Sequence, residues 1–239
     1  MNDGILFLIP VPLGDMSDLS TIPEHVRQRV ATLNHFVVER SKTARAFIKA
    51  AAPELSQSAL SVVELNDQTP DSELQNLLAP LVADVDVGLL SEAGCPAVAD
   101  PGSKLVALAH QKGIRVIPLV GPSSILLALM GSGMNGQSFA FVGYVAAKKG
   151  ETEIDLKKLE TTAKRLKQTQ IFIETPYRAQ QIIDAAIKTL NPDTKFCIAA
   201  DLTLETEFLL TKPISEWKKI FESPYPPNFH KRPTIFLIG

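Results

Sequence analysis

The sequence predicts an α/β fold built from two α/β domains. Two short apolar runs, residues 85–90 and 114–120, each end in small residues and Pro and are followed by a helical pattern. This order of strand, loop and helix is typical of parallel α/β units. The chain has 239 residues, 45% hydrophobic and 21% charged, which is enough for two small packed domains. Because no low-complexity linker interrupts it, we expect two closely packed domains, residues 1–120 and 121–239.

The first half alternates apolar strands with helical segments. Continuous apolar runs such as residues 5–9 are typical of strands buried on both faces of a parallel sheet. Pro23 suits a helix start, Asp100 a helix cap and Gly113 a helix end. The expected strands are 5–9, 36–38, 61–65, 85–90 and 114–119, and the expected helices are 24–32, one ending near 51, 71–81 and 103–112.

The second half predicts a second sheet, of mixed strand direction, with its own helices. The strands are expected at residues 139–144, 170–174, 196–200, 207–210 and 234–238. The helices are expected at residues 125–130, 154–166 and 179–190.

Charge and cysteine content exclude several classes of protein. A net charge of −2 argues against a protein that coats nucleic acid, although it permits a local basic patch on an RNA-modifying enzyme. Cys95 and Cys197 show neither metal-ligand spacing nor a disulfide framework, so we predict no metal site. No apolar run reaches the length of a membrane span, and we expect a soluble, cytoplasmic protein without membrane contact.

Three loops carry the predicted chemistry. Residues 10–15, 91–96 and 121–124 follow expected strands and are rich in Gly, Pro and Ser, with few ionisable groups. Such loops expose backbone N–H and C=O groups, which suits a neutral or zwitterionic cofactor. We expect the loops after 85–90 and 114–120 to face one small-molecule pocket. The alternative is that each loop is only a tight turn. Walker A, GxSxG and HExxH patterns are absent from the sequence.

The loops resemble those of a known family. AGCPAVADPG at residues 93–102 and VIPLVGPSS at 116–124 resemble motifs of the tetrapyrrole methylase superfamily of S-adenosylmethionine-dependent methyltransferases. The branch most similar to this chain methylates the 2′-hydroxyl of a cytidine in small-subunit ribosomal RNA. LIPVPLGDMSD at 8–18, IETPYR at 173–178 and AADLTLET at 199–206 resemble further motifs of that branch, in the same order.

The resemblance implies two α/β domains, a homodimer and S-adenosylmethionine bound in a cleft between the domains. The implied partner is ribosomal RNA or the small ribosomal subunit. The residues that it implies for cofactor binding are Pro12, Ala93, Gly94, Cys95, Val98, Ala99, Ser123, Ser124, Asp201, Leu202, Pro233 and Thr234.

The acceptor side departs from the branch pattern. The branch has AEDTRxT after its second strand, where this chain has VERSKT at residues 38–43, so that Arg40 replaces an acidic residue. Cys95 replaces the usual Thr before the Pro. A hydroxyl acceptor needs a base or a group that stabilises the developing oxyanion. The candidates by position are Glu39, Lys42, Arg45 and Glu92.

Two alternatives stay open for these candidates. Glu39 and Glu92 are alternatively paired loop carboxylates without a catalytic role, and Lys42 and Arg45 suit contacts with RNA phosphates better than acid–base chemistry. The function also has alternatives, namely methylation of a small molecule such as a tetrapyrrole, or a non-catalytic relative that keeps the cofactor pocket.

Overall fold

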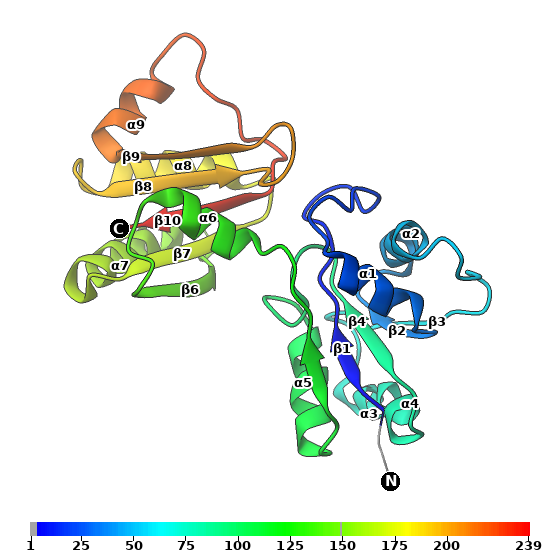
Figure 1. Ribbon diagram of the computed structural model, residues 1–239. Helices are drawn as coiled ribbons and strands as arrows, with labels where there is room; N and C mark the ends of the chain where they lie inside the picture. The colour runs from blue at the N-terminus through cyan, green and yellow to red at the C-terminus, as the bar shows by residue number, and fades with distance from the viewer. Residues whose placement is uncertain (1–3, 149) are drawn as a thin grey trace. The chain divides into compact units, whose positions relative to one another are not determined.

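The computed structural model describes residues 4–148 and 150–239. The chain divides into two compact units, Met1–Ser123 and Ser124–Gly239 (Figure 1).

The first unit contains a five-stranded sheet in which every strand pair is parallel. Its order is β3-β2-β4-β1-β5. The strands are β1 (Leu6–Leu8), β2 (His35–Val38), β3 (Ser61–Glu64), β4 (Val87–Leu90) and β5 (Val116–Pro118). The parallel sheet predicted for this half is therefore confirmed. Because the strands are parallel, the loops that follow them all leave from the same edge of the sheet.

Helices cover both faces of this sheet. Phe7 and Phe36 pack with α1 (Glu24–Ala31) and α2 (Ser41–Ala51) on one face. Leu6 and Val37, their neighbours along the strands, pack with α3 (Leu74–Leu77), α4 (Ala79–Val82) and α5 (Gly102–Gln111) on the other. Adjacent strand residues point to opposite faces, and so apolar runs without alternation form two cores.

Two helix predictions for this unit were wrong in detail. The helix expected over 71–81 is split into a 3₁₀ turn (η1, Asp71–Glu73), α3 and α4. Pro80 lies in the first turn of α4, where it has no N–H to donate to the preceding turn, and the helix is interrupted at Leu78. In contrast, α2 begins at Ser41, three residues after the end of β2 and earlier than expected.

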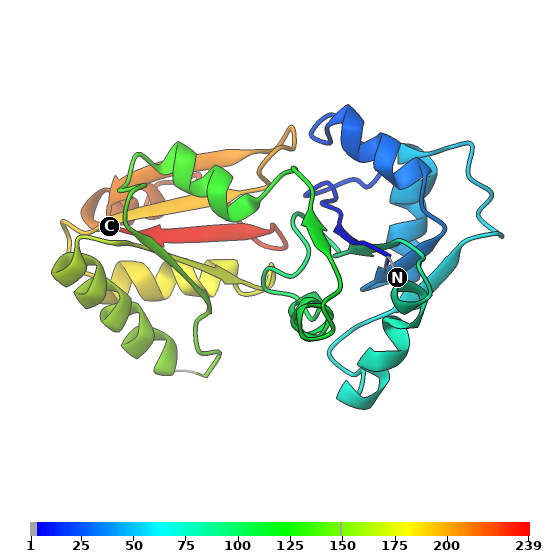
Figure 2. The same cartoon turned by 60° about the horizontal axis from the view of Figure 1, so that its bottom comes forward.

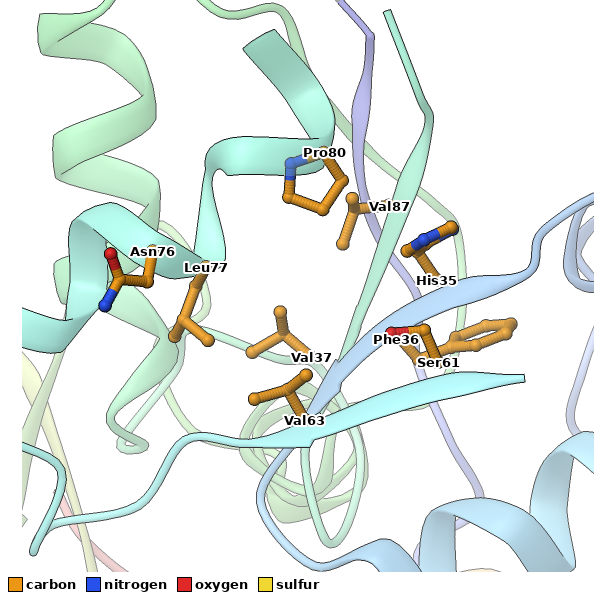
Figure 3. Close-up of a pocket in the computed structure, with 9 residues that line it drawn as sticks. All are labelled: His35, Phe36, Val37, Ser61, Val63, Asn76, Leu77, Pro80 and Val87. Carbon is orange, nitrogen blue, oxygen red and sulfur yellow. The ribbon is translucent and has the colours of Figure 1, made fainter. Parts of the chain in front are cut away.

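The broken helix leaves a small pocket on one face of the sheet. The pocket has a volume of about 210 Å³ and lies between α3–α4 and strands β2, β3 and β4. Figure 3 shows Val37, Val63 and Leu77 pointing toward one another in it. Its lining includes His35, Ser61 and Val87, the first residues of their strands, so the pocket lies toward the amino ends of the strands.

The second unit contains a mixed five-stranded sheet of order β6-β7-β10-β8-β9. Only the β6–β7 pair is parallel, which confirms the mixed sheet. The strands are β6 (Phe139–Tyr144), β7 (Thr169–Glu174), β8 (Lys195–Ala200), β9 (Phe208–Pro213) and β10 (Thr234–Ile238). The helices are α6 (Ser124–Ser132), α7 (Glu151–Leu166), α8 (Ala179–Thr189) and α9 (Ile214–Phe221).

Aromatic packing defines the core of this unit. The ring of Phe236 stacks between Phe172 and Phe196, with centroid separations of 5.4 and 5.7 Å. Helices α7, α8 and α9 cover this face, and Figure 2 shows α6 on the opposite side of the sheet from α7 and α8. The sequence interpretation missed α9, in which Trp217 is buried and donates from its indole N–H to the Phe196 carbonyl at 2.7 Å. Among the described residues, no helix is long and apolar enough to cross a membrane.

Candidate active site

Three loops of the first unit meet at the carboxyl edge of its sheet. Val11, after β1, and Gly94, after β4, exchange two backbone hydrogen bonds of 3.0 and 3.1 Å. The Cys95 thiol donates to the carbonyl oxygen of Pro122, after β5, at 3.4 Å. β1 lies between β4 and β5, and so the sheet order brings these loops together. The structure therefore places the loops after residues 85–90 and 114–120 side by side.

Close packing at this edge depends on two glycines. Gly94 has φ of +70°, a conformation that other residues adopt only with strain. A Cβ atom at Gly121 would lie 2.2 Å from Cγ of Pro10, so only glycine lets the two loops pack here. Both positions hold the backbone where the contacts described above can form.

One half-buried carboxylate organises the loop that begins at Ala93. Asp100 accepts hydrogen bonds from the backbone N–H groups of Ala97 at 2.9 Å and Gly102 at 2.8 Å. Burial raises the pKa of Asp100, although these hydrogen bonds oppose the shift. Ala97 and Ala99 have φ of +65° and +57°, and the carboxylate offsets part of that strain. Sequence reasoning identified Asp100 only as a helix cap and missed this role.

Two of the predicted catalytic residues, Glu39 and Glu92, lie together. Glu39 follows β2 and Glu92 follows β4, the neighbouring strand. The backbone N–H of Glu92 donates to Oε2 of Glu39 at 3.2 Å. Burial raises the pKa of the half-buried Glu39 carboxyl, and the negative charges of Glu92 and Asp100 add to the shift.

The Glu92 side chain has two further partners from the start of α2. The Thr43 hydroxyl donates to Oε1 of Glu92, and Nε of Arg40 lies 3.7 Å from Oε2. The Arg40 side chain is 74% exposed, so this ion pair contributes little to stability. Sequence reasoning missed Thr43, since 49 residues separate it from Glu92 and no local pattern links them.

The two predicted basic residues have different surroundings. Lys42 is exposed in the first turn of α2, close in the chain to Glu39. Arg45 instead donates from Nη1 to the carbonyl oxygen of Gln57 at 2.7 Å, in the loop between α2 and β3. That loop leads into the amino end of β3, so the structure anchors Arg45 away from the carboxyl edge.

Four residues predicted to bind the cofactor lie together at one edge of the second sheet. The backbone N–H of Asp201 donates to the Pro233 carbonyl at 3.0 Å. Leu202 and Thr234 are buried beside them. The Asp201 carboxylate accepts from Nε of Arg232 at 2.6 Å. This edge contains the carboxyl ends of β7 and β8 and the start of β10, because Thr234 pairs with Glu174 and with Ala200.

The residues of the first unit fit a cofactor held by the main chain. Ala93, Val98 and Ala99 are exposed and small or apolar. Pro12 is buried, and Ser123 is partly exposed at the end of the loop after β5, directly before Ser124 starts α6. Burial raises the pKa of the Cys95 thiol, so it stays protonated at neutral pH and is a poor nucleophile.

Comparison with known proteins places this architecture in a family. The statistical model of the tetrapyrrole (corrin/porphyrin) methylases matches residues 6–218. The ribosomal RNA small subunit methyltransferase I of Vibrio cholerae is 27% identical over 212 residues, which are 89% of this chain and 69% of that protein. The protein of the same name from Mesorhizobium japonicum is 30% identical over 206 residues, 86% of this chain and 66% of that protein. The chain thus spans about two thirds of the length of these relatives.

Solved structures show the same fold. The methyltransferase CobJ superposes on this chain with a TM-score of 0.63 at 16% identity. The alignment covers 99% of this chain and 94% of the CobJ chain. The uroporphyrin-III C-methyltransferase of Thermus thermophilus, complexed with S-adenosylhomocysteine, has a TM-score of 0.57 at 17% identity, covering 99% of this chain and 97% of its own. The chain therefore belongs to the tetrapyrrole (corrin/porphyrin) methylase family and is an S-adenosylmethionine-dependent methyltransferase.

Proposed function

We propose that the protein methylates a ribose 2′-hydroxyl in small-subunit ribosomal RNA. The observation that carries the proposal is the similarity, over 84–90% of this chain, to proteins named ribosomal RNA small subunit methyltransferase I from diverse bacteria. Because the matched region covers only about two thirds of these relatives, the substrate is a proposal for this chain. If ribosomal RNA is the substrate, the protein works in the cytoplasm.

The Glu39–Glu92 pair supplies the proposed acid–base chemistry. S-adenosylmethionine supplies a methyl group on a sulfonium, a good leaving group. In the reaction an O–C bond forms at the 2′-oxygen, the C–S bond breaks, and the hydroxyl proton must leave. Glu39, with its raised pKa, is the proposed acceptor of that proton. Glu92, oriented by Thr43, is proposed to position the hydroxyl.

The exposed Lys42 is proposed to contact an RNA phosphate rather than to transfer protons. It lies in the first turn of α2, which begins two residues after Glu39. For Arg45 the bond to Gln57 favours a structural role, and its assignment as a catalytic residue stays a prediction.

Methyl transfer to small ribosomal subunits tests the proposal directly. Subunits from a bacterial strain that lacks the corresponding methyltransferase are incubated with the protein and methyl-labelled S-adenosylmethionine. We expect label in RNA at a nucleotide whose 3′ linkage resists alkaline hydrolysis, because a 2′-O-methyl group blocks that cleavage. Label in a base would contradict ribose methylation. Binding of the cofactor without transfer to RNA would favour a tetrapyrrole-type acceptor or a non-catalytic relative.

In the first unit, the residues proposed to bind S-adenosylmethionine are Pro12, Ala93 to Ala99 and Ser123. A Ser123→Trp variant should lose S-adenosylmethionine binding in calorimetry while its circular dichroism stays unchanged, because the indole would fill the space beside the loop. Ser72→Trp, at an exposed position of η1, is the matched control. Unchanged affinity in Ser123→Trp would contradict the assignment of this loop.

We also propose that the protein is a homodimer that uses the second unit. The sequence of α6, SILLALMGS, is apolar around the whole helix, and Met130 on it is 79% exposed. Tyr144, on the edge strand β6, is 58% exposed. A second copy would cover these side chains. Light scattering should show a dimer that Met130→Glu converts to a monomer, whereas Val82→Glu, at an exposed position of the first unit, should leave the mass unchanged.

A further inference from the structure

Two segments of the second unit form an exposed surface of aromatic and basic side chains. Tyr177 lies just after β7, and His230 and Lys231 lie just before β10. The rings of Tyr177 and His230 meet edge to face, with centroids 6.2 Å apart and an interplanar angle of 73°. Nζ of Lys231 lies over the Tyr177 ring, 6.0 Å from its centroid. We call these three side chains the Tyr177 surface.

The backbone holds the Tyr177 surface in place. The N–H of Lys231 donates to the Pro176 carbonyl at 3.0 Å and so ties the two segments together. Lys231 has φ of +63°, a conformation that a residue with a side chain adopts only where the surrounding structure imposes it. The Tyr177 side chain is therefore presented by a fixed turn, although Tyr177 is 67% exposed.

Neighbouring charges are already engaged within the protein. Arg178 pairs with the buried Glu174 and also donates to the Ala146 carbonyl at 3.3 Å. Arg232 pairs with Asp201 at 2.6 Å. The Lys231 ammonium, in contrast, lies over an aromatic ring at the surface, where it can reach an anion in solvent without breaking an ion pair.

We propose that the Tyr177 surface binds a single-stranded segment of the substrate RNA. One base stacks on the Tyr177 ring, and Lys231 contacts an adjacent phosphate. This inference rests on the proposed function. Aromatic rings with nearby cations suit single strands, because an unpaired base offers its face and the backbone offers its charge. In a duplex the base faces are already stacked, so the surface selects unpaired RNA.

The location agrees with a role in presenting the acceptor. Glu174, three residues before Tyr177, lies opposite Thr234 in the antiparallel pairing of β7 and β10. The backbone N–H of Asp201 donates a hydrogen bond to the carbonyl of Pro233. The Tyr177 surface therefore adjoins the residues of the second unit that are expected to bind the methyl donor. Since the protein has a net charge of −2, RNA affinity must come from local sites of this kind rather than from bulk charge.

Binding of single-stranded RNA by the full chain tests the inference. The probe is a fluorescent oligonucleotide of about 12 nucleotides, a length within the usual site size of single-strand binders, and the same sequence in a duplex is the comparison. We expect Tyr177→Leu to weaken single-strand binding by about 5- to 100-fold, as the loss of one stacked base predicts. Tyr177→Phe should keep the affinity. Tyr225→Leu is the matched control, because Tyr225 is a more exposed tyrosine in the loop between α9 and β10.

Salt dependence tests the phosphate contact separately. Lys231→Gln should reduce the slope of log affinity against log salt by about 0.7, the value for one phosphate contact on a single strand. Lys188→Gln, at the other end of α8 from Tyr177, carries the same charge change and should keep the slope. Equal slopes in both variants would overturn the assignment of Lys231.

The outcomes separate this inference from the proposed function. If the wild-type protein methylates ribosomal RNA and Tyr177→Leu binds and methylates it as well as wild type, the Tyr177 surface is not an RNA site and the function stands. If wild type neither methylates RNA nor binds the oligonucleotide, both proposals fail. Preference for the duplex over the single strand would also overturn the inference.

Discussion

The backbone N–H of Glu92 donates to the carboxylate of Glu39 at 3.2 Å, and this bond connects the ends of two adjacent parallel strands. It places one carboxyl with a raised pKa beside a second whose side chain is held by Thr43. The pair lies at the carboxyl edge of the sheet, where the loops after β1, β4 and β5 also meet.

Thr43 is expected to act by orienting Glu92. Thr43→Val removes the hydroxyl donor and keeps the shape, so we expect kcat to fall about 10-fold with little change in the KM for S-adenosylmethionine. Thr43→Ser should restore kcat, because it restores the hydroxyl. Steady-state kinetics with RNA as acceptor measures both. If Thr43 only stabilises the fold, Thr43→Val will melt at a lower temperature with an unchanged kcat.

The raised pKa of Glu39 predicts a pH-dependent cost to folding. The folded state keeps the Glu39 proton to a higher pH than the unfolded state does, because the pKa of this carboxyl in the unfolded state is close to 4.5. Stability is therefore lost as the pH rises from the unfolded pKa through the folded pKa, and the loss persists above it. The free energy of unfolding of Glu39→Gln, compared with that of wild type, should therefore increase from pH 4 to pH 7. The increase should be less than about 1 kcal/mol, because water screens a half-exposed carboxyl. Denaturant titrations at both pH values measure the difference, with the exposed Glu54→Gln as control.

The same shift bears on the activity of Glu39. If Glu39 accepts the proton, methyl transfer requires its ionised form, and kcat should rise with pH across a range above the ordinary glutamate value. The rise should disappear in Glu39→Gln, together with most of the activity. A Glu39→Gln variant with a wild-type pH profile would exclude Glu39 as the base.

Asp100 is expected to hold the loop from Ala93 to Gly102 in shape. Asp100→Ala leaves the N–H groups of Ala97 and Gly102 without their acceptor, and it should lower the free energy of unfolding by about 1–3 kcal/mol. The affinity for S-adenosylmethionine should fall as well, since the loop supplies main-chain contacts. Asp100→Asn keeps one acceptor oxygen, so its stability and its cofactor affinity should lie between those of wild type and Asp100→Ala. Loss of stability with full cofactor affinity would show that the loop does not bind the cofactor.

Gly121 is expected to accept no side chain. In Gly121→Ala the new Cβ would lie 2.2 Å from Cγ of Pro10, and the rigid proline ring cannot move aside cheaply. We expect a loss of about 1–3 kcal/mol in the free energy of unfolding. Gly136→Ala, where nothing lies within 4 Å of the new Cβ, is the control and should be close to neutral. A neutral Gly121→Ala would show that the two loops are not packed this closely.

Local sequence patterns were sufficient to predict most elements of the fold. The bounds of β6 and β10 match the expected strands, because short apolar runs bounded by turn residues report burial directly. The exceptions are instructive. Pro80 breaks a helix that otherwise has a suitable pattern, and α9 was missed although Pro213 and Ile214 mark its start. In both cases a proline lies at the start of the helix, at Pro80 in the first turn of α4 and at Pro213 directly before α9.

The sequence by itself determined the fold class, the loops rich in small residues and the family motifs, because these depend on neighbours along the chain. Only the tertiary structure decided which loops meet. The strand order β3-β2-β4-β1-β5 brings Glu39 to Glu92 and Val11 to Gly94, and the register of β10 brings Pro233 to Asp201. Strand order and register arise from packing among residues far apart in sequence, and no local pattern specifies them.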